Sequence, residues 1–179
     1  MKALSVLSGI RKARAGSRQF FGARRRLVSR HARTVADASN TYEDRSANVS
    51  SMSKTPQDKN IELVRGMSTN FVAGRLDDVK IHVSDTMIME VPKGLPYSGS
   101  HKGWSGYLAV ATAMGEHFSE ISFAPPEYMA GGDQVVVLTH LKGKTKAGRT
   151  VDTPLTEIWK VKGDKVEKIT AFYFDTQGV

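Results

Sequence analysis

The sequence predicts an α+β domain, because two kinds of hydrophobic periodicity occupy different parts of the chain. Apolar residues recur at helical spacing early in residues 52–179, and long strand patterns joined by short turns fill the later part. A regular alternation of helices and strands would instead indicate a parallel α/β sheet. The length of 179 residues suits one domain with a tail. We therefore expect three helices, with one early strand between the second and the third, followed by a meander of long antiparallel strands.

The first helix is expected to begin at Pro56, because Thr55 is suited to cap it and Asp58 favours the positive end of the helix dipole. Gly74 can adopt the left-handed conformation that ends a helix. A shorter helix with two aspartates in its first turn follows. A third helix is expected over residues 104–118, after three glycines whose spacing does not match a phosphate-binding loop.

Strand patterns begin with a short apolar run at residues 86–91, which ends at a loop rich in Pro and Gly. From residue 121 onward strands dominate, and a pair of prolines bends the first of them. Turns are expected over residues 131–133 and 143–148, and Gly163-Asp164 is a typical two-residue hairpin turn. The predicted later strands cover residues 121–129, 134–142, 150–162 and 165–174.

The net charge of +8 lies entirely in residues 1–51, which hold 11 basic and 3 acidic residues. The remaining 128 residues hold 15 of each and are neutral. We therefore expect no nucleic-acid partner for residues 52–179, although a basic chain usually suggests one. No run of about 18 apolar residues appears, so no transmembrane segment is expected. The absence of Cys excludes disulfides, thiolate metal sites and a Cys nucleophile.

The basic leader, residues 1–51, is rich in Arg and Ser and has no acid before Asp37. This composition is typical of a mitochondrial or plastid transit peptide. A second interpretation is a miscalled start, with Met52 as the true first residue and a cytoplasmic protein. A third is an arm for nucleic acid or anionic lipid. We expect the leader to be disordered, because it has too few apolar residues to bury.

Glu157 is an acid on the apolar face of the predicted strand 150–162, since side chains alternate along a strand. Burial would raise its pKa and leave it as a protonated donor. The alternative is a structural role, in which the carboxylate accepts hydrogen bonds from a neighbouring side chain and takes no part in catalysis. A strict two-residue turn would place Thr170 opposite Glu157, whereas one bulge would bring Tyr173 to its side.

Other residue types offer little chemistry. His140 lies in a Val-rich strand and could act as a general base, although a surface or satisfied histidine is the favoured interpretation. The histidines show no metal-binding spacing with acids, and no serine lies in a nucleophile elbow. We therefore expect no metal and no cofactor.

Six short motifs follow one another in an order that resembles the SnoaL-like family. This family is part of the nuclear transport factor 2-like superfamily, which includes ketosteroid isomerase. The resemblance covers about residues 59–176. Its motifs are a helix break at 73–77, a strand and Pro-Gly loop at 89–96, a Gly-x-x-x-Gly segment at 97–103, a Gly-Asp-x-Val-Val strand start at 132–137, a Trp-containing hairpin at 159–166 with Gly and Asp exchanged, and a Tyr-x-Asp-Thr end at 172–176.

The resemblance implies a cone-shaped curved sheet closed by three helices, with an apolar pocket inside and dimerisation through the sheet. It also allows a test for steroid isomerisation, which needs a carboxylate base, a Tyr and a neutral acid. The matching positions are Val91, Met67 and Glu157. The first two cannot do this chemistry, so the steroid isomerase mechanism is rejected.

We therefore expect a homodimeric SnoaL-like domain whose pocket binds a small, mostly hydrophobic molecule. If it is an enzyme, cofactor-independent acid–base chemistry is expected, as an isomerase, cyclase, dehydratase or hydrolase, with Glu157 as the catalytic acid. The alternative is a non-catalytic dimeric ligand-binding or protein-interaction domain. The residues expected to line the pocket are Met89, Val91, Trp104, His140 and Tyr173.

Overall fold

The computed structural model describes residues 54–179, which form three helices and seven strands. The basic leader lies outside the described residues, and so do the predictions made for it. No helix within residues 54–179 is long and apolar enough to cross a membrane. The elements are α2 (Pro56–Val72), α3 (Leu76–Lys80), β1 (Val83–Val91), β2 (Gly99–Lys102), α4 (Gly103–His117), β3 (Phe118–Phe123), β4 (Glu127–Gly131), β5 (Gln134–Thr145), β6 (Thr150–Lys162) and β7 (Lys165–Tyr173).

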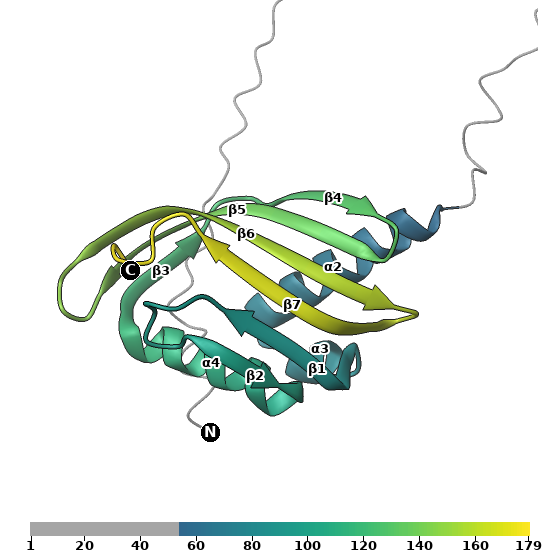
Figure 1. Ribbon diagram of the computed structural model, residues 1–179, viewed down its shortest axis with the longest axis horizontal. Coiled ribbons are helices and arrows are strands. Elements are labelled where there is room, and N and C mark those ends of the chain that lie inside the picture. Colours follow the sequence, from purple (N-terminus) through teal and green to yellow (C-terminus); the bar gives the residue numbers. More distant parts are fainter. Residues whose placement is uncertain (1–53) are drawn as a thin grey trace, which may run out of the picture. The chain divides into compact units, whose positions relative to one another are not determined.

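The strands form one strongly curled sheet, and α2 and α4 lie on the same side of it (Figure 1). The strand order is β2-β1-β7-β6-β5-β3, and β4 pairs with another part of β5. Strands β5, β6 and β7 form the expected antiparallel meander. The early strand β1 joins β7 in parallel, which local patterns could not reveal because they do not specify the direction of a distant partner. The predicted α+β cone is confirmed.

Helix α2 begins where the sequence predicts. The Thr55 hydroxyl accepts a hydrogen bond from the backbone N–H of Asp58 (3.1 Å), and the Asp58 carboxylate accepts one from the backbone N–H of Thr55 (3.0 Å). This reciprocal pair is a capping box. The helix buries Val64 and Met67, and Gly74 follows its end with a φ of 75°.

Several boundaries differ from the prediction. Strand β1 begins at Val83 rather than at residue 86, and the strand expected over residues 121–129 is divided into β3 and β4. Helix α4 ends at His117, and Phe118 already belongs to β3. Gly143 lies within β5, and its lack of a side chain allows β3 to pass very close to it. A Cβ at Gly143 would meet the carbonyl oxygen of Glu120 at 2.4 Å. The turn expected over residues 143–148 therefore begins only after Thr145. The short strand β2 has no apolar pattern and was not predicted.

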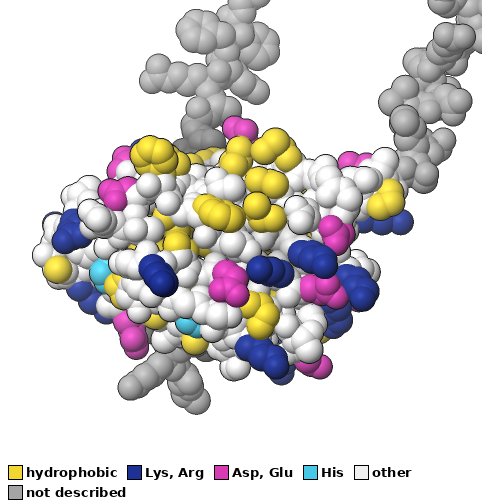
Figure 2. All heavy atoms as spheres, viewed as in Figure 1, with side chains coloured by type: hydrophobic (Ala, Val, Ile, Leu, Met, Phe, Trp, Pro, Cys, Tyr) yellow, Lys and Arg dark blue, Asp and Glu magenta, His cyan; other side chains and the backbone are white. Residues whose placement is uncertain are grey.

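The sheet has a buried inner face and an outer face that carries exposed hydrophobic residues. Along β6 the odd-numbered residues point inward, as the alternation predicts. On the outer face, register places Met129, Val136 and Ile158 in one row across β4, β5 and β6. The next row holds Leu138, Thr156 and Phe172. Figure 2 shows hydrophobic side chains gathered on one side of this face. We call the set Met129, Val136, Leu138, Ile158 and Phe172 the outer apolar patch.

Candidate functional site

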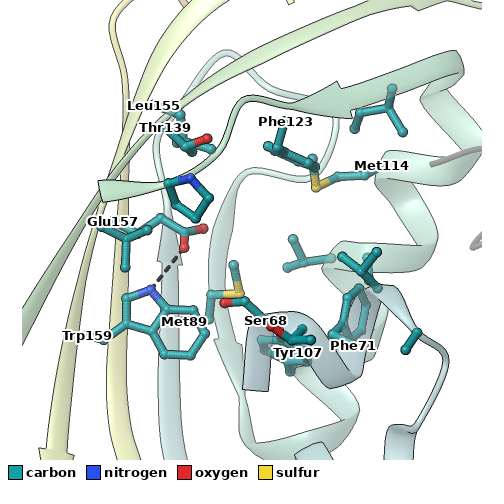
Figure 3. Close-up of a pocket in the computed structure, with 18 of the residues that line it drawn as sticks. Ser68, Phe71, Met89, Tyr107, Met114, Phe123, Thr139, Leu155, Glu157 and Trp159 are labelled. Carbon is teal, nitrogen blue, oxygen red and sulfur yellow. Dashed lines mark hydrogen bonds between the residues drawn. The ribbon is translucent and has the colours of Figure 1, made fainter. Parts of the chain in front are cut away.

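A cavity of about 660 Å³ lies between the inner face of the sheet and helices α2 and α4. This volume is within the usual range for small-molecule sites, and most of the lining is apolar. Phe71 of α2 and Tyr107 and Met114 of α4 face Glu157 and Trp159 of β6 across this space (Figure 3). The prolines between β3 and β4 complete the lining on one side.

Glu157 is the acidic group of the cavity lining. Its position on β6 points it inward, between the inward-facing Leu155 and Trp159. The indole N–H of Trp159 donates a hydrogen bond to Glu157 Oε2 at 2.9 Å (Figure 3). Burial raises the pKa of Glu157, and the indole bond opposes this rise in part. The indole occupies Oε2, so Oε1 is the oxygen suited to carry a proton toward a ligand.

Two tyrosines add polar groups near Glu157. Burial raises the pKa of both Tyr107 and Tyr128, and the charge of Glu157 adds to each rise. Tyr107 stacks on Trp104 with ring centroids 5.8 Å apart and meets the edge of Phe71 at 5.4 Å. Glu157, Tyr107 and Tyr128 therefore give the otherwise apolar cavity lining three hydrogen-bonding groups.

The tyrosines fixed by these contacts were not among the predicted site residues. Tyr107 could have been found, since it lies three residues after Trp104 on the expected helix face. Tyr128 could not, because the bent strand pattern around Pro125-Pro126 leaves the inward face of β4 undefined. The cation of Arg65 lies 5.0 Å from the centroid of the Tyr128 ring and helps to fix it.

Of the six predicted site residues, the structure places Met89 and Glu157 on the cavity lining. Val91 is two residues further along β1, on the same inward face, but within the packed core. Trp104 lies behind Tyr107 rather than on the wall. An alternating pattern identifies the inward face of an element but does not show which part of that face borders a hollow.

Tyr173 and His140 also lie outside the cavity lining. A bulge between Lys160 and Val161 puts Ala171 opposite Glu157 and Tyr173 opposite Leu155, so the bulged alternative is the observed one. Tyr173 accepts a hydrogen bond from the Tyr97 hydroxyl at 3.4 Å. His140 occupies an even-numbered position of β5, where it faces outward and pairs with Asp152.

The described residues contain no group of three or more His, Asp or Glu side chains that could hold a metal ion. Charge is sparse in the cavity as well. Arg75 and Glu157 are the charged residues among those that line it.

Comparison with known proteins places this architecture in a family. Residues 64–169 match the SnoaL-like domain family, which is more than half of the chain. The chain belongs to the SnoaL-like family. No curated protein matches it.

Solved structures share the fold of this SnoaL-like domain at low sequence identity. An NTF2-like protein from Burkholderia xenovorans LB400 has 24% identity and a TM-score of 0.64, with 70% of this chain and 95% of that chain covered. TerC, co-crystallised with polyporic acid, has 19% identity and a TM-score of 0.58, with 65% and 92% covered. A candidate SnoaL-like polyketide cyclase from Jannaschia sp. CCS1 has 17% identity and a TM-score of 0.59, with 69% and 91% covered.

Proposed function

We propose that this SnoaL-like domain binds a small, mostly hydrophobic molecule in its cavity and donates a proton to it from Glu157. One observation carries the proposal: a carboxyl group lies in an apolar cavity wall, and a single indole bond fixes one of its oxygens. Burial raises the pKa of this group, which widens the pH range over which the acid is protonated. A neutral acid in a dry pocket is a good hydrogen-bond donor to a carbonyl or hydroxyl oxygen.

Acid–base catalysis without a cofactor is the chemistry that these groups support best. Proton donation from Glu157 would activate a carbonyl or a leaving hydroxyl group, as an isomerase, cyclase, dehydratase or hydrolase requires. Tyr107 and Tyr128 could hold a second oxygen of the ligand, because both line the cavity together with Glu157. Cyclisation is the first of these reactions to test, since the Jannaschia structure with this fold is a candidate polyketide cyclase. We do not propose the steroid isomerase mechanism, because Met67 and Val91, which match the positions of its tyrosine and its base, are buried hydrophobic residues.

The ligand test is a thermal-shift screen of aromatic and polycyclic compounds on the full chain. Polyporic acid belongs in the panel, because TerC was co-crystallised with it. A ligand at 100 times its Kd stabilises a protein by about 2.7 kcal/mol, which a melting curve resolves. Compounds that accept a hydrogen bond from the neutral acid should keep most of their stabilisation in Glu157→Gln, because the amide still donates. Turnover should be lost, because the amide cannot transfer a proton. The exposed acid Glu120 on β3 provides the matched control Glu120→Gln.

If no compound stabilises the wild type, the cavity does not bind molecules of this class. A compound that binds wild type and Glu157→Gln equally, with no turnover by either, would support the alternative of a non-catalytic ligand-binding domain. Product formation by the wild type that is lost in Glu157→Gln supports the enzyme.

We also propose that the protein is a homodimer that pairs through the outer apolar patch. Phe172 and Met129 are each 51% exposed there, and their rows run across four neighbouring strands. A contiguous exposed apolar surface of this kind marks an interaction site. Multi-angle light scattering of the full chain should give the mass of two chains. A single-chain mass across micromolar concentrations would contradict the dimer.

For the location in the cell we propose the cytoplasm, with a mitochondrion or plastid as the alternative if residues 1–51 form a transit peptide. The intact mass of protein isolated from its native source tests this choice. A mass that corresponds to a chain beginning at Met52 or Ser53 supports a miscalled start, whereas a mass that corresponds to cleavage near Arg33 supports a transit peptide.

A further inference from the structure

We infer that the ligand is an anionic amphiphile whose carboxylate is held by Arg75 at one end of the cavity while its apolar body fills the rest. This inference rests on the proposed binding of a small hydrophobic molecule. It narrows the ligand class from apolar molecules in general to apolar acids, and it assigns Arg75 as the residue that determines this specificity.

The distribution of charge along the lining is the first argument. Arg75 and Glu157 are the charged residues of the lining, and they belong to different walls. Glu157 projects from β6, whereas Arg75 follows α2. Figure 3 shows Phe71, near the end of α2, across the cavity from Glu157. Arg75 is the cation among these lining residues, and apolar walls beside it strengthen its attraction for an anion.

The position of the Arg75 guanidinium is the second argument. Nε and Nη2 both donate to the Asn70 side-chain oxygen, at 3.0 and 2.6 Å, and the backbone N–H of Arg75 donates to the Asn70 carbonyl at 2.9 Å. These bonds fix the plane of the guanidinium. Nη1 of Arg75 donates no hydrogen bond within residues 54–179, so it can still donate to a carboxylate. A fixed guanidinium suits a carboxylate better than a flexible ammonium does.

Asp78 does not remove this capacity. Its carboxylate lies 3.6 Å from Arg75 Nε, on the side already used by Asn70, and both side chains are more than half exposed. Exposed ion pairs of this kind contribute little to the free energy of folding. Replacing part of the contact with Asp78 by a contact with a ligand carboxylate therefore costs little free energy.

The apolar lining on the cavity side of Arg75 is the third argument, beside the polar contacts with Asn70 and Asp78. Val72 and Leu76 lie close to Arg75 in sequence and line the same cavity, and Phe123 and Pro125 line it from the β3–β4 segment. Val72 and Phe123 remain 39% and 37% exposed, which places them where the cavity opens to solvent. A ligand with its acid at Arg75 would therefore keep that group near water and its apolar part inside.

The test compares two ligands that share the biphenyl body, 4-biphenylcarboxylate, which is an anion at pH 7, and 4-biphenylmethanol, which is neutral. Their Kd values are measured by isothermal titration calorimetry on the full chain at pH 7. We expect the wild type to bind the carboxylate at least tenfold more tightly than the alcohol, and this preference to shrink as salt screens the charge. In Arg75→Gln the ratio should fall to about one, because the carboxylate loses its partner cation and most of its advantage in affinity. Lys80→Gln, at the exposed end of α3, is the matched control and should keep the wild-type ratio.

Three outcomes would overturn the inference, and they point to different failures. Equal binding of both ligands by the wild type would remove the anion preference but leave the cavity proposal standing. A preference that persists in Arg75→Gln would assign it to another group. Binding of neither ligand would contradict the proposed function itself. Arg75→Lys guards against misfolding of the Gln variant, since it keeps the charge and should keep a weakened preference.

Discussion

Glu157 combines two opposing influences on one carboxyl group. Burial raises its pKa, and the Trp159 indole lowers it by donating to Oε2. The alternation of residues 150–162 was enough to predict this acid on the apolar face, because period-two patterns are unambiguous in a long strand. The partner was not predictable, since Trp159 is a same-face neighbour two residues away whose rotamer decides the contact.

The raised pKa of Glu157 predicts a pH-dependent stability. A folded-state pKa above the unfolded value means that the contribution of Glu157 is fully present below the usual carboxyl pKa. It is lost as pH rises through the raised value, because ionisation costs more in the folded state. A tenfold change in the acid dissociation constant corresponds to ~1.4 kcal/mol. Urea unfolding between pH 4 and 8 should show Glu157→Gln gaining stability relative to wild type as pH rises. A difference that is constant with pH would contradict the raised pKa.

Removing the indole donor should raise the pKa of Glu157 above its value in the wild type. Trp159→Phe deletes the N–H that stabilises the ionised form, so the pKa of Glu157 should rise further. The lost hydrogen bond should also cost about 1–3 kcal/mol in the free energy of unfolding. The pH profile of urea unfolding separates the two effects, because Trp159→Phe should move the window of pH-dependent stability upward. An unmoved window would show that the indole does not act on Glu157.

At the scale of elements, the sequence predicts the ends of a helix or strand well where the residues that fix the end lie close together in the chain. The capping box of α2 and the hairpin between β6 and β7 involve residues close in sequence, so their signals are local. The short strand β2, the end of α4 and the parallel pairing of β1 with β7 depend on distant partners. Tertiary contacts therefore decided the features that the sequence patterns missed.

The capping box predicts a measurable contribution to stability. Thr55→Ala removes the side-chain oxygen that accepts from the Asp58 backbone N–H and should lower the free energy of unfolding by ~1 kcal/mol. Lys59→Ala, one turn into the same helix and exposed, should change it much less. Urea denaturation monitored by circular dichroism provides the measurement. Equal losses in both variants would contradict the role of the cap.

The close approach of β3 and β5 makes Gly143 sensitive to substitution. A Cβ at this position would lie 2.4 Å from the Glu120 carbonyl oxygen, so Gly143→Ala must push the strands apart. We expect a loss of about 1–3 kcal/mol, which is typical of overpacking. Gly131→Ala is the matched control, because nothing lies within 4 Å of a Cβ there. Thermal unfolding of the two variants should differ clearly, and similar melting temperatures would contradict the tight contact.

At the scale of the whole molecule, the described fold offers two apolar surfaces with different uses. The inner one encloses the cavity and the outer one lies open on the sheet. The pocket and the dimer were expected from the resemblance alone, because strand patterns show which residues face inward but not the shape of the space between elements. The dimer stays a prediction.

The proposed dimer predicts that one charge on the outer sheet face separates the subunits. Phe172→Lys places a charge in the outer apolar patch, where a partner would have to bury it. Light scattering should then give a single-chain mass, with an unchanged circular dichroism spectrum. Ile81→Lys is the control, since Ile81 is 58% exposed but follows α3 and is not part of this patch. A dimer that survives Phe172→Lys would place the interface elsewhere.

The bond between Trp159 and Glu157 also gives the protein an intrinsic optical reporter. Trp104 and Trp159 are its two indole groups, so Trp104→Phe leaves the emission of Trp159 alone. This fluorophore is in direct contact with the titrating carboxyl group and borders the cavity. Its spectrum should therefore record both the protonation of Glu157 and the arrival of a ligand, without any added dye.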